Sequence, residues 1–87
     1  MARKRKIEDI MTSEYVTIGE LVQLTRMRYS TLKHYTEQGM IPFEQLGQNL
    51  TRRYKRIETL ERIEKIQSLK DLGLTIPEII DELNKEN

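Results

Sequence analysis

The sequence predicts a mainly α-helical domain whose helices are interrupted once by a two-stranded ribbon. Three observations predict this fold. Apolar residues recur at helical spacing in several segments, two segments begin with a capping-box motif, and residues 43–54 combine turn residues with short runs suited to strands. A length of 87 residues suits one small domain with a lean core.

The first capping box is Thr-Ile-Gly-Glu at residues 17–20. The Thr17 hydroxyl can accept a hydrogen bond from the amide of Glu20, while the Glu20 carboxylate reaches back to the first residue. The helix that follows is expected to bury one stripe, which consists of Ile18, Leu21, Val22 and Thr25.

A second short helix is expected over residues 29–38, with Leu32 and Tyr35 on its inner side. Gly39 stands where the residue after a helix adopts a left-handed conformation, and Pro42 prevents the helix from resuming. Two short helices joined by a tight turn predict a helix-turn-helix.

Residues 43–46 and 51–54 are expected to form two strands, with a turn over residues 47–49. A ribbon directly after a helix-turn-helix is a wing, so the predicted architecture is a winged helix-turn-helix. The second strand and its end give the wing a positive rim, formed by Arg52, Arg53, Lys55 and Arg56.

A longer helix is expected over residues 57–72 and ends at Gly73. Its apolar residues recur every three positions, so the apolar track winds around the helix and its two ends face different neighbours. The track consists of Ile57, Leu60, Ile63, Ile66, Leu69 and Leu72. A second capping box at residues 75–78 begins a last amphipathic helix. The last two helices are expected to form a hairpin across Gly73; alternatively, part of the track meets a second subunit.

Charge is divided unevenly along the chain. Residues 1–56 carry 11 Lys and Arg against 6 Asp and Glu, a net charge of +5, whereas residues 57–87 carry 4 against 8, a net charge of −4. This division predicts a basic binding surface supported by an acidic half, with solvated charge as the alternative.

Several classes of function are excluded by what the sequence lacks. There is no Cys, and therefore no disulfide or thiolate zinc site, and no apolar run approaches the roughly 20 residues that span a bilayer. One His, no Gly-rich phosphate loop and scattered carboxylates do not assemble an acid–base pair or a metal site. We therefore expect no enzyme activity, cofactor, metal or membrane partner.

Three segments, in order, resemble the DNA-binding domain of MerR-type transcription regulators: YVTIGELVQLTRMRYSTLKHYTEQGMIP, RRY and LKDLGLTIPEIIDEL. The resemblance covers about residues 16–83. It implies that a dimer binds an inverted repeat, with the second helix in the major groove and the wing on the flanking backbone. We therefore divide the chain into residues 1–15, a basic N-terminal arm or short helix, and residues 16–87, a MerR-like winged helix-turn-helix domain.

The chain departs from the family pattern at several positions. Residues 33–36 read Lys-His-Tyr-Thr where Arg-Tyr-Tyr-Glu is usual, and Lys cannot make the bidentate grip of Arg. Arg26 stands at the usual Gly after the first helix, and Arg28 stands at the usual Ser cap, which leaves Ser30 as a candidate late cap. The long dimerisation helix and effector domain of many family members are absent up to Asn87, so no small-molecule effector is evident.

The outer side of the second helix is predicted to contact DNA. We assign Lys33 to phosphate or guanine, and Tyr29 and His34 to phosphate or base edges. Tyr35 is expected in the core with its hydroxyl at the rim, and stays a candidate because the resemblance associates this Tyr with the DNA side. On the wing, the resemblance favours Arg52 for backbone contact, and the tip could enter a minor groove. The full candidate set is Arg28, Tyr29, Ser30, Thr31, Lys33, His34, Tyr35, Gln48, Asn49, Arg52 and Arg53.

The N-terminus supplies two further candidates. A basic arm could lie along phosphates, or be a solvated terminus, and consists of Arg3, Lys4, Arg5 and Lys6. The glutamine-synthetase-repressor branch of the family pairs through a short N-terminal segment. The corresponding apolar dimerisation patch here would be Ile7, Ile10 and Met11, with a frayed tail as the alternative.

The predicted function is sequence-specific binding of double-stranded DNA by a transcriptional regulator, acting as a homodimer or higher assembly on DNA. The first alternative is a small architectural factor that binds arrays of sites cooperatively, such as a plasmid partition or replication accessory or a recombination directionality factor. The second is a protein-interaction module that uses the acidic half. The expected location is the cytoplasm, at the nucleoid or a plasmid.

Overall fold

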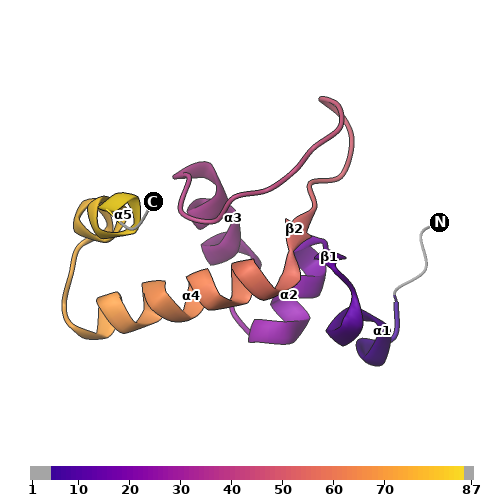
Figure 1. Cartoon of the computed structure of the whole chain (residues 1–87), viewed down its shortest axis with the longest axis horizontal. Helices are drawn as coiled ribbons and strands as arrows, with labels where there is room; N and C mark the ends of the chain where they lie inside the picture. The colour runs from indigo at the N-terminus through magenta and orange to yellow at the C-terminus, as the bar shows by residue number, and fades with distance from the viewer. Residues whose placement is uncertain (1–4, 86–87) are drawn as a thin grey trace.

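A computed structural model describes residues 5–85, and within them it contains five α-helices and one two-stranded antiparallel sheet (Figure 1). In chain order the elements are α1 (Ile7–Thr12), β1 (Tyr15–Val16), α2 (Ile18–Thr25), α3 (Tyr29–Glu37), β2 (Tyr54–Lys55), α4 (Arg56–Asp71) and α5 (Ile76–Lys85). The mainly α-helical fold class with a small sheet is thereby confirmed.

The start of α2 is fixed by the expected capping box. The Thr17 hydroxyl accepts a hydrogen bond from the Glu20 amide at 3.2 Å, and the Glu20 carboxylate accepts one from the Thr17 amide at 2.9 Å. These bonds satisfy amides that the first turn of a helix cannot bond internally. Leu21 is buried on the inner side, so this short helix is held both at its end and by its core contact.

The turn from α2 to α3 breaks two local preferences. Arg26 adopts a left-handed backbone with φ 60° and ψ 18°, which strains a residue that carries a Cβ. Arg28 precedes α3, and no side chain caps that helix. Ser30 lies inside α3, so the expectation of a late Ser30 cap is wrong. After α3, Gly39 has the expected left-handed φ of 73°.

The sheet lies elsewhere than the sequence predicted. Glu44 and Arg53 form only a single antiparallel bridge, through two backbone hydrogen bonds of 2.8 Å, and the remaining residues of 43–53 form no strand. The strand β2 pairs instead with β1, with Val16 opposite Tyr54. Burial explains the difference, because Val16 and Tyr54 are both core residues, whereas the side chains of residues 43–53 are mostly exposed. We call residues 43–53 the wing loop.

The apolar track of α4 leaves the core at both ends, so its first and last residues are exposed and do not pack against the two neighbours that the winding predicted. Ile63 and Ile66 are buried near the middle, whereas Ile57 and Leu72 are 59% and 76% exposed. The track is therefore used by the fold only over its central turns.

The turn into α5 follows the predicted signals. Gly73 has φ 90°, and a second capping box joins Thr75 to Glu78 through bonds of 2.8 and 3.4 Å. Ile79 and Leu83 then bury the inner side of α5. In Figure 1, α4 lies across the view and α5 is seen nearly end-on, so the two helices of this hairpin cross.

A single core joins every helix and both strands. Its buried apolar members are Ile10, Val16, Leu21, Leu32, Tyr35, Met40, Ile41, Tyr54, Ile63, Ile66, Ile79 and Leu83. The helix-turn-helix, the sheet and the last two helices therefore form one packed body.

The N-terminal segment is tied to this body by Arg5. Its guanidinium donates to both carboxylate oxygens of Glu20 at 2.6 and 2.7 Å, and also to the Ser13 hydroxyl at 2.7 Å. These bonds from Arg5 are the main cause that lowers the pKa of Glu20, and the Thr17 amide lowers it further, while partial burial opposes both.

Glu20→Gln should weaken the fold in a pH-dependent way. Because the pKa of Glu20 is lowered from 4.5, the ionised carboxylate stabilises the folded state above about pH 4.5, and this stabilisation is lost as the pH falls through the lower folded-state pKa. We expect Glu20→Gln to reduce the free energy of unfolding by about 1–2 kcal/mol at neutral pH, and the difference to shrink in acid. Urea unfolding at a series of pH values measures it.

Glu78→Gln is the matched variant, because Glu78 occupies the other capping box but is exposed and has no arginine partner among residues 5–85. It should change stability less than Glu20→Gln. Equal losses in the two variants, or a loss at Glu20 that does not vary with pH, would contradict the role assigned to the Arg5–Glu20 pair.

Arg26→Gly should stabilise the protein. Glycine adopts the left-handed backbone without strain, and its greater freedom in the unfolded chain offsets part of the gain, so we expect the free energy of unfolding to rise by up to about 1 kcal/mol. Thermal unfolding measures this change. Arg26→Ala keeps the Cβ and should give no such increase; if it stabilised as much as glycine, the backbone explanation would be wrong.

Candidate nucleic-acid interface

Helix α3 has a buried side and an exposed side, as its spacing predicts. Leu32 and Thr36 face the core, and Thr31 is half-buried. The exposed side carries the polar and cationic candidates Arg28, Tyr29, Ser30, Lys33 and His34. Lys33 forms no ion pair with another residue in the described range 5–85, so its charge is available to a ligand.

Tyr35 lies in the core, which confirms the expectation of burial, and its secondary assignment as a DNA contact is corrected. Its exposed fraction is 1%, its hydroxyl accepts a hydrogen bond from the Lys70 ammonium at 3.3 Å, and that ammonium lies 5.9 Å from the ring centroid. The phenol is thus directed at α4. Since Lys33 lies two positions away on a helix of 100° per residue, its side of α3 faces away from α4.

Tyr54 connects α3 to the wing loop. The hydroxyls of Tyr54 and Thr36 are 2.9 Å apart, and Thr36 donates its proton to the Leu32 carbonyl, so Tyr54 is the donor between the two. The Tyr54 ring lies 6.2 Å from that of Phe43, and the Arg52 guanidinium stacks over Phe43 at 4.7 Å. This series of contacts fixes the position of Arg52 relative to α3.

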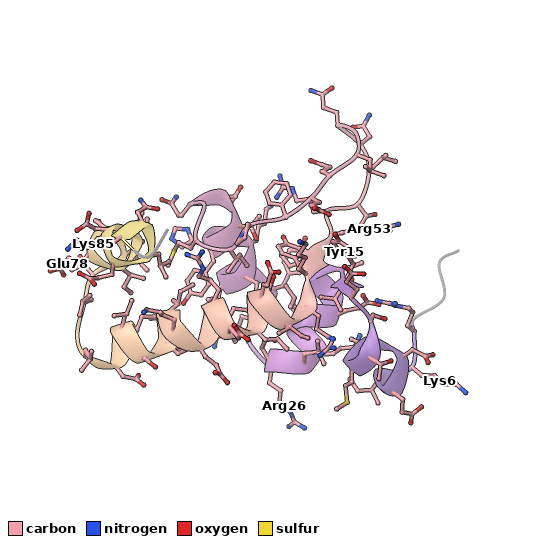
Figure 2. The ribbon with its side chains drawn as sticks, viewed as in Figure 1. Lys6, Tyr15, Arg26, Arg53, Glu78 and Lys85 are labelled. Atoms are coloured by element: carbon pink, nitrogen blue, oxygen red, sulfur yellow. The ribbon has the colours of Figure 1, made fainter. Side chains whose placement is uncertain are left out.

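The two arginines of the wing loop have different surroundings. Arg52 is half-buried against Phe43, whereas Arg53 is exposed and extends from the base of the loop (Figure 2). Gln48 and Asn49 are exposed at the tip. Which of these side chains meets DNA remains a prediction.

Helix α3 and the wing loop lie on the same side of α4 (Figure 1). In Figure 1, α3 and the wing loop are both above α4, and the loop projects away from that helix. We call the candidates of α3 and of the wing loop the α3–wing surface and define it as residues 28–31, 33, 34 and 48–53.

The candidate N-terminal arm is only partly open to a ligand. Arg5 is committed to Glu20 and Ser13, so its assignment as an arm residue is corrected to a structural role. Lys6 is exposed but lies on the side of α1 away from the wing loop (Figure 2). Arg3 and Lys4 lie outside the described residues.

The candidate dimerisation patch is smaller than expected. Ile10 is fully buried in the core, so its assignment to a surface patch is corrected, because this position faces α2. Ile7 and Met11 remain exposed, one turn apart on α1.

Sequence reasoning missed three contacts that shape this surface. They are the Arg5–Glu20 ion pair, the stacking of Arg52 on Phe43, and a hydrogen bond from the Tyr15 hydroxyl to Glu44 that raises the pKa of Tyr15. Each joins residues that are nine or more positions apart in the sequence. Of the three, only the stacking of Arg52 on Phe43 has a signal in the sequence, namely an aromatic residue and an Arg-Arg pair within the same loop.

Neither a cluster of metal ligands nor a membrane-spanning helix is found among residues 5–85. Among residues 5–85 there is no group of three or more His, Cys, Asp or Glu side chains that could hold a metal ion. No helix within that range is long and apolar enough to cross a membrane.

The elements and their order define a winged helix-turn-helix domain. The sequence model described as MerR HTH family regulatory protein matches residues 16–86. The chain therefore belongs to the MerR HTH family of regulatory proteins, which confirms the resemblance.

One curated relative is the nodulation protein NolA of Bradyrhizobium elkanii, which is 34% identical over 62 residues. The match covers 71% of this chain but 28% of NolA, so the chain spans less than a third of that relative's length. No solved structure gives a significant match.

Tyr54→Phe should destabilise the fold modestly. It removes the hydroxyl that donates to Thr36 in the core, and we expect the free energy of unfolding to fall by about 0.5–1.5 kcal/mol. Urea unfolding measures the loss. Tyr29→Phe makes the same chemical change on the exposed side of α3 and should leave stability unaltered; equal effects at the two positions would contradict the role given to Tyr54.

Proposed function

We propose that this chain binds double-stranded DNA as the DNA-binding part of a regulator of transcription. In this proposal α3 lies in the major groove and the wing loop contacts the flanking backbone. The protein acts as a dimer on an inverted repeat, in the cytoplasm, at the nucleoid or on a plasmid.

The α3–wing surface is the observation that carries the proposal. Lys33 projects from the side of α3 opposite Tyr35, and Arg52 is held in place by Phe43. Neither Lys33 nor Arg53 is paired with an acidic side chain among residues 5–85. Cations that lack internal partners and share one side of a small domain match the charge of a DNA backbone.

The dimensions of α3 also support this reading. Its 9 residues correspond to a rod about 13 Å long, and a major groove about 12 Å wide admits a helix. The uncapped start of α3, with Arg28 beside it, leaves backbone amides and a guanidinium free to receive a phosphate.

Dimerisation is proposed through α1. Ile7 and Met11 present an apolar surface one turn apart, on the part of the chain that precedes the helix-turn-helix. A patch of two side chains is small for a stable interface, so the dimer is expected to form mainly on DNA, where two half-sites bring the copies together.

The deciding experiment is selection of bound sequences from a random duplex pool, followed by mass measurement of the complex. One inverted repeat with two copies of the protein supports the proposed regulator. A tandem array with many copies supports an architectural factor instead. No duplex binding at low salt would end the proposal and leave a protein-interaction module as the remaining reading.

Lys33→Ala and Arg52→Ala should weaken DNA binding without unfolding the protein. Each removes one cation from the α3–wing surface, so we expect roughly tenfold weaker binding and a salt slope reduced by about 1. The free energy of unfolding should change by no more than about 1 kcal/mol. Fluorescence anisotropy at several salt concentrations and urea unfolding measure the two effects.

Two control variants separate charge from folding. Arg26→Gly removes a cation on the side away from the wing loop (Figure 2) and should leave affinity unchanged. Leu32→Ala opens a cavity in the core and should reduce the free energy of unfolding by about 2–5 kcal/mol. Equal loss of affinity in Arg26→Gly, or unfolding in Lys33→Ala, would contradict the orientation assigned to α3.

A further inference from the structure

The tip of the wing loop presents two apolar side chains to solvent. Leu46 is 89% exposed, the most exposed large apolar side chain among residues 5–85, and Leu50 is 55% exposed. Neither belongs to the core cluster or packs against it. The fold therefore gives no reason for leucine at either position.

The tip is closed by its own hydrogen bonds. The Gln45 side-chain amide donates to the Leu50 carbonyl at 2.6 Å and to the Gln48 carbonyl at 3.3 Å, and the Leu50 amide donates to the Gly47 carbonyl at 3.1 Å. A Cβ atom at Gly47 would make an ordinary van der Waals contact with the Leu50 side chain at 3.4 Å, so Leu50 lies beside this turn. These contacts close the turn that carries Leu46 and Leu50, and the two side chains line the same surface hollow.

The loop that carries the two leucines has a net positive charge, because Arg52 and Arg53 outnumber Glu44, which lines the same hollow as Leu46 and Leu50. Residues 45–53 contain no acidic residue, and Arg52 and Arg53 follow directly on the chain. An apolar tip between polar residues and arginines is complementary to a nucleic-acid groove, whose floor is apolar base and whose walls are phosphate.

The shape of the tip points to the same occupant. A standard protein–protein interface buries about 800 Å² on each partner, which requires a broad surface, whereas the wing loop is a single projecting turn (Figure 1). A minor groove about 6 Å wide accepts one such turn.

We propose that Leu46 and Leu50 form an apolar wedge that enters the minor groove beside the α3 site, partly unstacks one base step and kinks the duplex. This inference rests on the proposed function and adds a deformation of the DNA to it. Pyrimidine–purine steps unstack most easily, so bound sequences should favour TA or CA at a fixed distance from the bases that α3 contacts.

The test uses the whole chain and a duplex selected by the wild-type protein, labelled at both ends for energy transfer and carrying 2-aminopurine at the flanking step. The wild type should kink the duplex by about 20–90° and raise 2-aminopurine fluorescence. The double variant Leu46→Ala/Leu50→Ala should remove both signals and weaken binding at least tenfold, with an unchanged salt slope because no phosphate contact is lost.

The control is Leu72→Ala, which shortens a leucine that is 76% exposed at the end of α4, outside the α3–wing surface; it should retain the kink. A kink that survives the leucine substitutions overturns the inference. So does a leucine variant that changes only the number of protein copies per duplex, since the leucines would then contact a second copy. Wild-type binding to straight DNA overturns the wedge alone, whereas no binding to any duplex overturns the proposed function as well.

Discussion

The buried hydrogen bond between Tyr54 and Thr36 is the constraint on which the rest of the structure depends. The backbone of Tyr54 pairs with Val16 in the sheet, its ring lies in the core, and its hydroxyl reaches α3. One residue therefore joins the sheet, the helix-turn-helix and the base of the wing loop. In a core this small, a polar group buried at such a junction must be bonded, and its single partner specifies one arrangement of the elements.

The position of Arg52 in the candidate α3–wing surface depends on that junction. Phe43 packs against Tyr54, and Arg52 stacks on Phe43, so a cation in an otherwise irregular loop is positioned by the core. At the base of the same loop, the Glu44 backbone bridges to Arg53. The loop can thus carry candidate binding residues without forming a regular two-stranded ribbon, because the contacts at its base set its direction.

Structural features that depend on residues close together in the sequence were predicted. Contacts between residues far apart in the sequence were missed. The capping boxes join residues three apart, and the inner side of α3 follows from the spacing of Leu32 and Tyr35, so both could be read directly. The sheet pairs Val16 with Tyr54, and Arg5 meets Glu20 fifteen residues away. No local preference selects such pairs. The candidate surface on α3 was therefore predictable, whereas the stacking of Arg52 and the structural role of Arg5 were not.

The turn between α2 and α3 contains two residues, Arg26 and Arg28, that local structural preferences disfavour. Arg28 stands before an uncapped helix, where the positive end of the helix dipole disfavours a cation and Ser or Asp would stabilise the fold. Sites that break local rules tend to be functional. An anion bound at the start of α3 would offset the repulsion between Arg28 and the positive end of the helix dipole, since both would attract it. Nothing in the structure explains Arg26, whose strained backbone faces away from the wing loop. Arginine at position 28 is therefore unfavourable in the free protein and would become favourable with a phosphate bound at the start of α3.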